Sequence, residues 1–159
     1  MKTLDQIKTL SLAVANAVER IAALEKKRRA GRHTIVRSYA FEAAHSLTHL
    51  PPAHKCHALH GHSYVVEVAV VAELDGCGMV MDFADLDTVV APIIDRLDHS
   101  NLNDQFDFFT TSENLARWLF LRVDLKLEVK QVNGARFEVD WVSVSETRRS
   151  KAIYARNVG

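Results

Sequence analysis

Apolar residues recur with two different periods along the chain, and these periods predict its elements. Residues 34–41 and 64–73 have the composition of β-strands, and the second run is apolar on both faces, as in a strand that is buried on both sides. Residues 137–146 alternate apolar and charged side chains, which indicates a half-buried strand, and residues 152–155 are a short strand candidate. We therefore expect an antiparallel sheet of four strands.

Two helices are predicted between the second and third of these strands. Asp82 caps an amphipathic pattern that continues over residues 86–97, and Pro92 inside it should kink the helix or mark a new start. The second helix begins around residues 110–113, a segment that fits a capping box, and continues through Val123. This order predicts an α+β domain with both helices on one face of the sheet.

The first 29 residues form a third helical pattern. Apolar residues follow each other at alternating spacings of three and four: Ile7, Leu10, Val14, Ala17, Ile21 and Leu24. A basic run at 26–29, followed by Gly31, suits the end of such a helix. The helix is either a self-association arm or packs against its own domain, and the sequence leaves both open. We divide the chain into a helical extension, residues 1–31, and a domain, residues 32–159.

Composition excludes several classes of function. A chain of 159 residues with 48% apolar residues can build one domain with its own core. Lys and Arg number 20, as do Asp and Glu, so no net field favours nucleic acid or an anionic membrane. We found neither an apolar run of about 18 residues nor a signal sequence, and we expect a cytoplasmic protein whose two cysteines are free thiols. Cys77 is expected to be an ordinary turn residue.

Histidines are concentrated between residues 41 and 64, which hold six of the eight. His60 and His62 point to the same side of an extended chain, and His45 ends a strand that can lie beside the strand starting at Tyr64. Three imidazoles without a fourth protein ligand fit an open zinc site, in which water or substrate takes the remaining position. For each of these histidines taken singly, a surface loop residue explains the sequence as well as a metal ligand does.

Three further positions can carry chemistry. Cys56 precedes His60 closely, and cationic surroundings favour a thiolate that serves as base or nucleophile; the alternative is a fourth structural metal ligand. Asp98 and His99 form a pair in which the carboxylate orients the imidazole for proton transfer. Glu146 ends a strand and can accept two hydrogen bonds from a guanidine-like edge, although locally it also reads as a solvated carboxylate.

Several motifs occur together in the order and spacing of one family. They are Phe41-Glu42-Ala43-Ala44-His45, Cys56-x-x-x-His60-Gly61-His62, Asp82-Phe83, Leu97-Asp98-His99-x-x-Leu102-Asn103, Thr111-Ser112-Glu113-Asn114 and Glu146-Thr147. From residue 33 to 156 the chain resembles the 6-pyruvoyltetrahydropterin synthase / 6-carboxytetrahydropterin synthase family. The departures are Thr110, where proline is common, the basic residues after Glu146, and the additional first 30 residues.

The resemblance implies a role for each matched position. The zinc ligands are His45, His60 and His62; the catalytic residues are Cys56, Asp98 and His99; and the residues that bind the pterin are Glu146, Thr111 and Ser112. It also implies the tunnelling fold, in which subunits join their sheets into a ring, typically as hexamers. The Asp–His pair then comes from a neighbouring subunit, and the active sites lie at subunit interfaces.

The three residues between Cys56 and His60 resemble the bacterial carboxytetrahydropterin synthases of queuosine biosynthesis. The implied reaction is a zinc-dependent lyase reaction that converts 7,8-dihydroneopterin triphosphate to 6-carboxy-5,6,7,8-tetrahydropterin, acetaldehyde and triphosphate. The alternatives are a pyruvoyl-forming or aldolase-like activity on the same pterin, and a non-catalytic zinc- or pterin-binding module. Candidates for holding the triphosphate are Lys55, Arg148, Arg149 and Lys151.

Overall fold

The computed structural model describes residues 6, 12–22, 31–129 and 137–156, and the chain divides into two units, residues 1–32 and 33–159. In the first unit residues 12–22 are helical, within the helix that the sequence predicts for residues 1–29. The predicted seam positions Ile7, Leu10 and Leu24 lie outside the described residues, as does a turn expected at Asn133-Gly134.

The second unit is built on a sheet with the strand order β3-β1-β2-β4-β5. Its centre is the antiparallel pair β1 (His33–His45) and β2 (His60–Ala72), each longer than predicted. β4 (Glu138–Thr147) pairs antiparallel with β2, and β5 (Ser150–Ala155) forms one edge. The prediction of four antiparallel strands is wrong by one, because β3 (Ser100–Asn101) pairs parallel with β1. A polar strand of two residues is too short to produce a periodic pattern.

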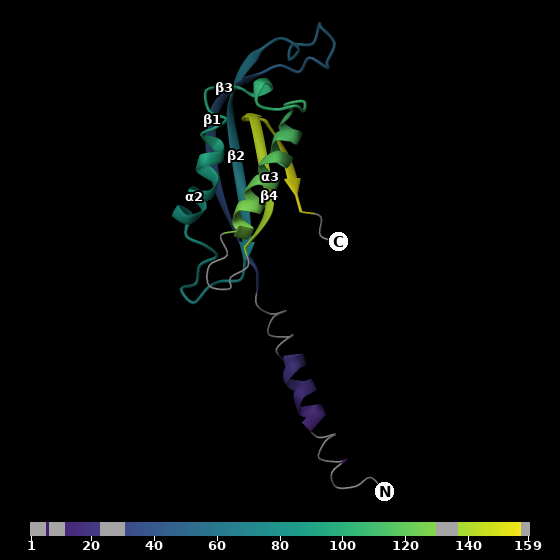
Figure 1. Ribbon diagram of the computed structural model, residues 1–159, viewed down its shortest axis with the longest axis vertical. Coiled ribbons are helices and arrows are strands. Elements are labelled where there is room, and N and C mark those ends of the chain that lie inside the picture. Colours follow the sequence, from purple (N-terminus) through teal and green to yellow (C-terminus); the bar gives the residue numbers. More distant parts are fainter. Residues whose placement is uncertain (1–5, 7–11, 23–30, 130–136, 157–159) are drawn as a thin grey trace. The chain divides into compact units, whose positions relative to one another are not determined.

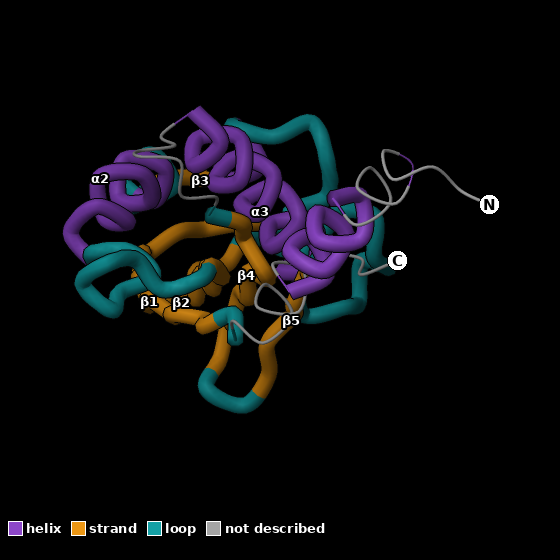
Figure 2. Tube along the Cα trace, turned by 90° about the horizontal axis from the view of Figure 1, so that it is seen from below, coloured by secondary structure: helices purple, strands orange, loops and turns teal. Residues whose placement is uncertain are grey.

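Two helices cover one face of this sheet, α2 (Phe83–Ile94) and α3 (Ser112–Val129), as Figures 1 and 2 show. The side chain of Asp82 caps α2 by accepting a hydrogen bond from the Ala84 N–H at 2.8 Å. Pro92 starts no new helix: it lies in the last turn of α2, which ends at Ile94, three residues before the end of the predicted pattern. A single-turn 3₁₀ helix, η1 (Leu102–Asp104), lies between the two helices.

The start of α3 lies inside the predicted segment 110–113, with Ser112 as the first helical residue. Thr111 Oγ1 accepts from the Asn114 N–H at 3.4 Å, which makes Thr111 the capping residue. Thr110, the first residue of the predicted segment, is fully buried. Two consecutive threonines fit the sequence rule almost equally well, and the tertiary structure decides between them.

The core lies between the helices and the sheet, and its alternation sets the orientation of β2. Tyr64, Val66, Val68 and Val70 face the helices and are fully buried, each contributing about 1.5–3 kcal/mol by removal from water. Side chains at the intervening positions point to the uncovered face, where Val65 is exposed. Extending the same alternation to the start of β2 places His60 and His62 on the side of the helices.

None of the helices in the described part of the chain combines the length and the hydropathy of a membrane span.

Candidate metal centre

The three predicted metal ligands meet where β1 ends and β2 begins. His45 is paired directly opposite His60 in the antiparallel register, and His62 follows on the same face of β2. The ring centroid of His45 lies 4.7 Å from that of His60 and 5.2 Å from that of His62. The centroids of His60 and His62 are 4.8 Å apart. One nitrogen from each ring lies within 4.8 Å of the other two, so these histidines could hold a metal ion.

Hydrogen bonds on the far side of two rings decide which nitrogen faces this centre. Nδ1 of His45 lies 2.8 Å from the carbonyl oxygen of Thr110, and Nδ1 of His60 lies 2.8 Å from that of Ala58. A carbonyl only accepts, so each Nδ1 carries the proton and each Nε2 presents a lone pair. The Nε2 atoms of all three histidines are buried and have no hydrogen-bond partner among the described residues. Buried nitrogens without partners are costly, and a shared cation satisfies all three at once.

Burial also favours the metal-binding form of two of the rings, those of His45 and His62. Burial lowers the pKa of the His45 imidazole, although the Thr110 carbonyl and the Glu146 carboxylate act in the opposite direction. The pKa of His62 is lowered for the same main reason, against the influence of Glu146 and with smaller contributions from the other two rings and Lys55. A lowered pKa favours the neutral imidazole, which is the ligand form.

A carboxylate and the first residues of α3 form a wall beside the three histidines. Glu146 Oε1 accepts a hydrogen bond from Ser112 Oγ at 2.8 Å, and its Oε2 lies 3.8 Å from His62 Nε2. Thr111 caps the same helix, so all three predicted substrate-binding residues lie next to the histidine cluster. The hydrogen bond from Ser112 thus joins the carboxylate to the first turn of α3.

Cys56 lies in the loop of residues 46–59, which extends beyond the ends of β1 and β2 (Figure 1). Its N–H donates to His54 Nδ1 at 3.1 Å, and its carbonyl accepts from the Leu47 N–H at 2.8 Å. The residue is half-buried and its thiol is free. Among the described residues no hydrogen bond joins this thiol to the three imidazoles, so the loop places Cys56 by its backbone.

Asp98 and His99 are held against β1, on its other side. Asp98 Oδ1 accepts from the Glu42 N–H at 2.8 Å, and its Oδ2 lies 2.9 Å from His99 Nδ1. These contacts, the Glu42 N–H first, lower the pKa of the Asp98 carboxyl. His99 adopts a φ of 53°, and its N–H donates to the Glu42 carbonyl at 2.6 Å. Both ends of the pair are thus fixed, while the side chain of His99 is 79% exposed.

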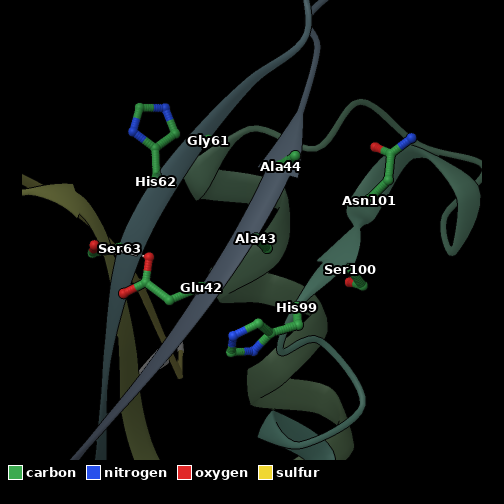
Figure 3. A pocket seen from close by; sticks show the side chains of 9 residues that line it. All are labelled: Glu42, Ala43, Ala44, Gly61, His62, Ser63, His99, Ser100 and Asn101. Carbon is green, nitrogen blue, oxygen red and sulfur yellow. Dashed lines mark hydrogen bonds between the residues drawn. The ribbon is translucent and has the colours of Figure 1, made fainter.

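The His99 ring borders an open hollow of about 470 Å³ at the edge of the sheet (Figure 3). Its lining includes Glu42, which accepts a hydrogen bond from Ser63 Oγ at 2.9 Å, and Asn101. In Figure 3 the ring of His62 points away from that of His99. The structure therefore brings the three histidines and Glu146 together, but leaves the Asp98–His99 pair of the same chain outside this cluster.

Two residues that contact the cluster were missed by the sequence analysis. Thr110 supplies the carbonyl that orients His45, and a backbone acceptor leaves no sequence signal. Tyr64 is fully buried and packs edge-on against His45 and His62, with centroid distances of 5.9 and 5.6 Å. Its place two residues after His62, on the same face of β2, was the signal that could have found it.

The family described as 6-pyruvoyl tetrahydropterin synthase matches residues 34–157. A 6-carboxy-5,6,7,8-tetrahydropterin synthase of Synechocystis is 39% identical over 127 residues, which covers 76% of this chain and 91% of the relative. A dihydroneopterin monophosphate aldolase of Pyrococcus furiosus is 35% identical over 116 residues, covering 67% of this chain and 96% of the relative.

The solved structures agree with the sequence relatives. The structure of 6-pyruvoyl tetrahydropterin synthase from Caenorhabditis elegans superimposes with a TM-score of 0.68 at 30% identity, and the match covers 81% of this chain and 99% of that one. The expected α+β fold is thereby confirmed. The family match spans nearly all of the second unit, including the three histidines and Glu146. The chain belongs to the 6-pyruvoyl tetrahydropterin synthase family.

Proposed function

We propose that this protein is a zinc-dependent lyase that converts 7,8-dihydroneopterin triphosphate to 6-carboxy-5,6,7,8-tetrahydropterin, acetaldehyde and triphosphate. The observation that carries the proposal is the group of three buried Nε2 atoms, which have no hydrogen-bond partner in the described part of the chain and lie beside the carboxylate of Glu146. It is supported by the Synechocystis relative, whose name is that of a 6-carboxytetrahydropterin synthase. The place of the reaction in queuosine biosynthesis and the cytoplasmic location are part of the same proposal.

Zinc is the metal that suits this donor set. Three neutral imidazoles with an open fourth position match catalytic zinc sites, and His45, His60 and His62 would hold the ion. When bound, zinc supplies Lewis-acid chemistry that acidifies a C–H bond next to a coordinated oxygen. The Nδ1–H bonds to Thr110 and Ala58 keep two of the ligands in the required tautomer.

Glu146 anchors the pterin in this proposal. With one oxygen occupied by Ser112, the carboxylate keeps acceptor capacity for the N–H groups of a guanidine-like edge. Thr111 and Ser112 lie on the same side of the site, at the N-terminal end of α3. The anchor lies beside His62, so a pterin held there extends its side chain toward the metal centre.

Proton transfer is assigned to Cys56 and to the Asp98–His99 pair. The thiol group of Cys56 removes or returns a proton at the side chain of the substrate, and the imidazole of His99, whose tautomer Asp98 fixes, passes that proton on. Within one chain this pair borders the hollow at the sheet edge, which His62 also lines, and the described residues show no hydrogen bond between the pair and the three imidazoles. We therefore assign the pair to the site of a neighbouring subunit.

A homo-oligomer follows from this assignment, and we propose the hexamer that the resemblance implies. Within the described residues of the second unit the sheet has two open edges, one at β5 and one along most of β1, because β3 pairs there only with Ala43 and Ala44. Open edges pair readily with a further strand. We treat residues 1–31 as an extension of this assembly, since the family match begins at residue 34.

Among the basic residues, Lys55 is the best candidate for holding the triphosphate. It lies in the loop of Cys56, close enough to influence the pKa of His62. The ammonium group of Lys151 is already paired with Glu67, on the uncovered face of the sheet. Arg148 and Arg149 lie in the turn between β4 and β5 and remain secondary candidates.

An aldolase reaction on a dihydroneopterin is the second candidate, favoured by the Pyrococcus relative. Product analysis of the zinc-loaded protein given dihydroneopterin triphosphate separates the two. Acetaldehyde and a carboxypterin support the synthase, whereas pterin products without acetaldehyde overturn it. Bound zinc without any turnover identifies a non-catalytic module.

A further inference from the structure

Asn103 belongs to a motif of the chain that the proposed reaction does not use. It lies in η1, and its side-chain amide pairs with both peptide groups of Ser46, the residue that follows His45. Asn103 Oδ1 accepts from the Ser46 N–H at 2.7 Å, and Asn103 Nδ2 donates to the Ser46 carbonyl at 2.9 Å. The amide thus takes the place of a neighbouring strand at the point where β1 ends.

A second link leads from the same amide to the ring of His45. Asn103 Nδ2 lies 3.5 Å from Thr110 Oγ1, which lies 3.3 Å from His45 Nδ1. The Thr110 carbonyl accepts from the same Nδ1 at 2.8 Å. Thr110 and His45 are both fully buried, so water does not compete for these bonds.

His45 is the last residue of β1, and in the proposed site it is a metal ligand. The Asn103 amide fixes the backbone on one side of His45, while Thr110 fixes the ring and its tautomer. We propose that Asn103 and Thr110 are positioning residues for His45, which hold its Nε2 toward those of His60 and His62. This inference rests on the metal site of the proposed function.

The test is the affinity of the full-length protein for zinc, measured by competition with a chelator. Asn103→Asp keeps the size and one acceptor, but it loses both donated bonds and sets a carboxylate oxygen against the Ser46 carbonyl. We expect zinc to bind about 10- to 100-fold more weakly, as for other partners of metal ligands. The matched control is Gln105→Glu, which loses donors to Arg96 and Ser100 in the same segment but has no link to His45; its zinc affinity stays at the wild-type value.

Thr110→Val tests the second link and covers the case in which Asn103→Asp does not fold. Valine keeps the carbonyl and removes Oγ1, so we expect a smaller loss of zinc affinity, restored by Thr110→Ser. The absorption spectrum of the cobalt-substituted protein reports distorted coordination in Thr110→Val. Thermal unfolding of the metal-free variants separates a loss of affinity from a loss of fold.

Each outcome bears on one proposal. Wild-type protein that binds no zinc overturns the proposed function. Wild-type protein that binds zinc, with an Asn103→Asp variant of equal affinity, overturns the role of Asn103. If that variant does not fold, an unchanged affinity and cobalt spectrum in Thr110→Val overturn the positioning network.

Discussion

Glu146 Oε2 lies 3.8 Å from Nε2 of His62, so the carboxylate at the end of β4 borders the candidate metal centre. Its other oxygen accepts from Ser112 at the start of α3. The position of Glu146 is therefore set by a helix and a strand that both belong to the core. A substrate held by this carboxylate is aligned with the metal by rigid elements rather than by a loop.

Glu146→Gln should weaken the binding of the pterin and leave the metal in place. The amide keeps one acceptor but loses the charge, and a charge-assisted hydrogen bond contributes about 1.5–3 kcal/mol, or roughly 10- to 100-fold in affinity. The measurements are KM for dihydroneopterin triphosphate and zinc content. Glu73→Gln, at an exposed position, is the control. Unchanged KM in Glu146→Gln would remove the residue from the substrate site.

Cys56→Ala should abolish turnover while zinc remains bound. The thiol is assigned to proton transfer, and the three histidines suffice as ligands. Product formation and zinc content are measured on the same sample. Cys77→Ala is the matched control, because Cys77 lies exposed in the turn after β2. If Cys56→Ala instead loses its zinc, the cysteine is a fourth ligand, which is the structural alternative raised by the sequence.

The three histidines could be predicted from sequence because their geometry follows from strand alternation alone. His60 and His62 share a face in any extended chain, and an antiparallel partner ending in His45 completes the group. The cap of α3 and the second edge strand could not be obtained in this way. Thr110 and Thr111 differ in burial, which depends on the position of His45, and β3 exists only because Ser100 and Asn101 happen to lie beside β1.

The contacts around the three histidines could not be predicted from the sequence either, but the reason is different. The contact that orients His45 uses a backbone carbonyl, and every residue has one. The Asn103 amide binds the backbone of Ser46 across 57 positions of sequence separation. Such contacts depend on how η1 packs against the end of β1, and no local pattern carries that information.

Asp87→Asn should destabilise the fold near neutral pH, and this destabilisation should disappear in acid. The Asp87 carboxylate receives two hydrogen bonds from Arg37 and one from Tyr39, which link β1 to α2, and the Arg37 bonds are the main cause of its lowered pKa. A lowered pKa means that the stabilisation is complete above the pKa of the unfolded carboxyl, about 4. It is lost as the pH falls through the lower pKa of the folded state.

Thermal unfolding of the metal-free protein at a series of pH values measures this difference. At pH 7 the wild-type protein should have a higher Tm than Asp87→Asn. Below about pH 4 the Tm values of the two proteins should converge. Asp107→Asn removes one carboxylate from an exposed loop position and controls for net charge. A gap between wild type and Asp87→Asn that persists in acid would show that packing, rather than ionisation, is responsible.

Mixing two inactive variants tests whether subunits share an active site. Cys56→Ala and His99→Ala should each be inactive alone. In co-expressed oligomers, some sites combine an intact Cys56 from one subunit with an intact His99 from its neighbour. For random assembly of equal amounts, about a quarter of the sites are complete, and about that fraction of wild-type turnover should return. A site formed within one chain predicts no recovery at any ratio, because no chain then carries both residues; mixing the two proteins after assembly is the control and should also remain inactive.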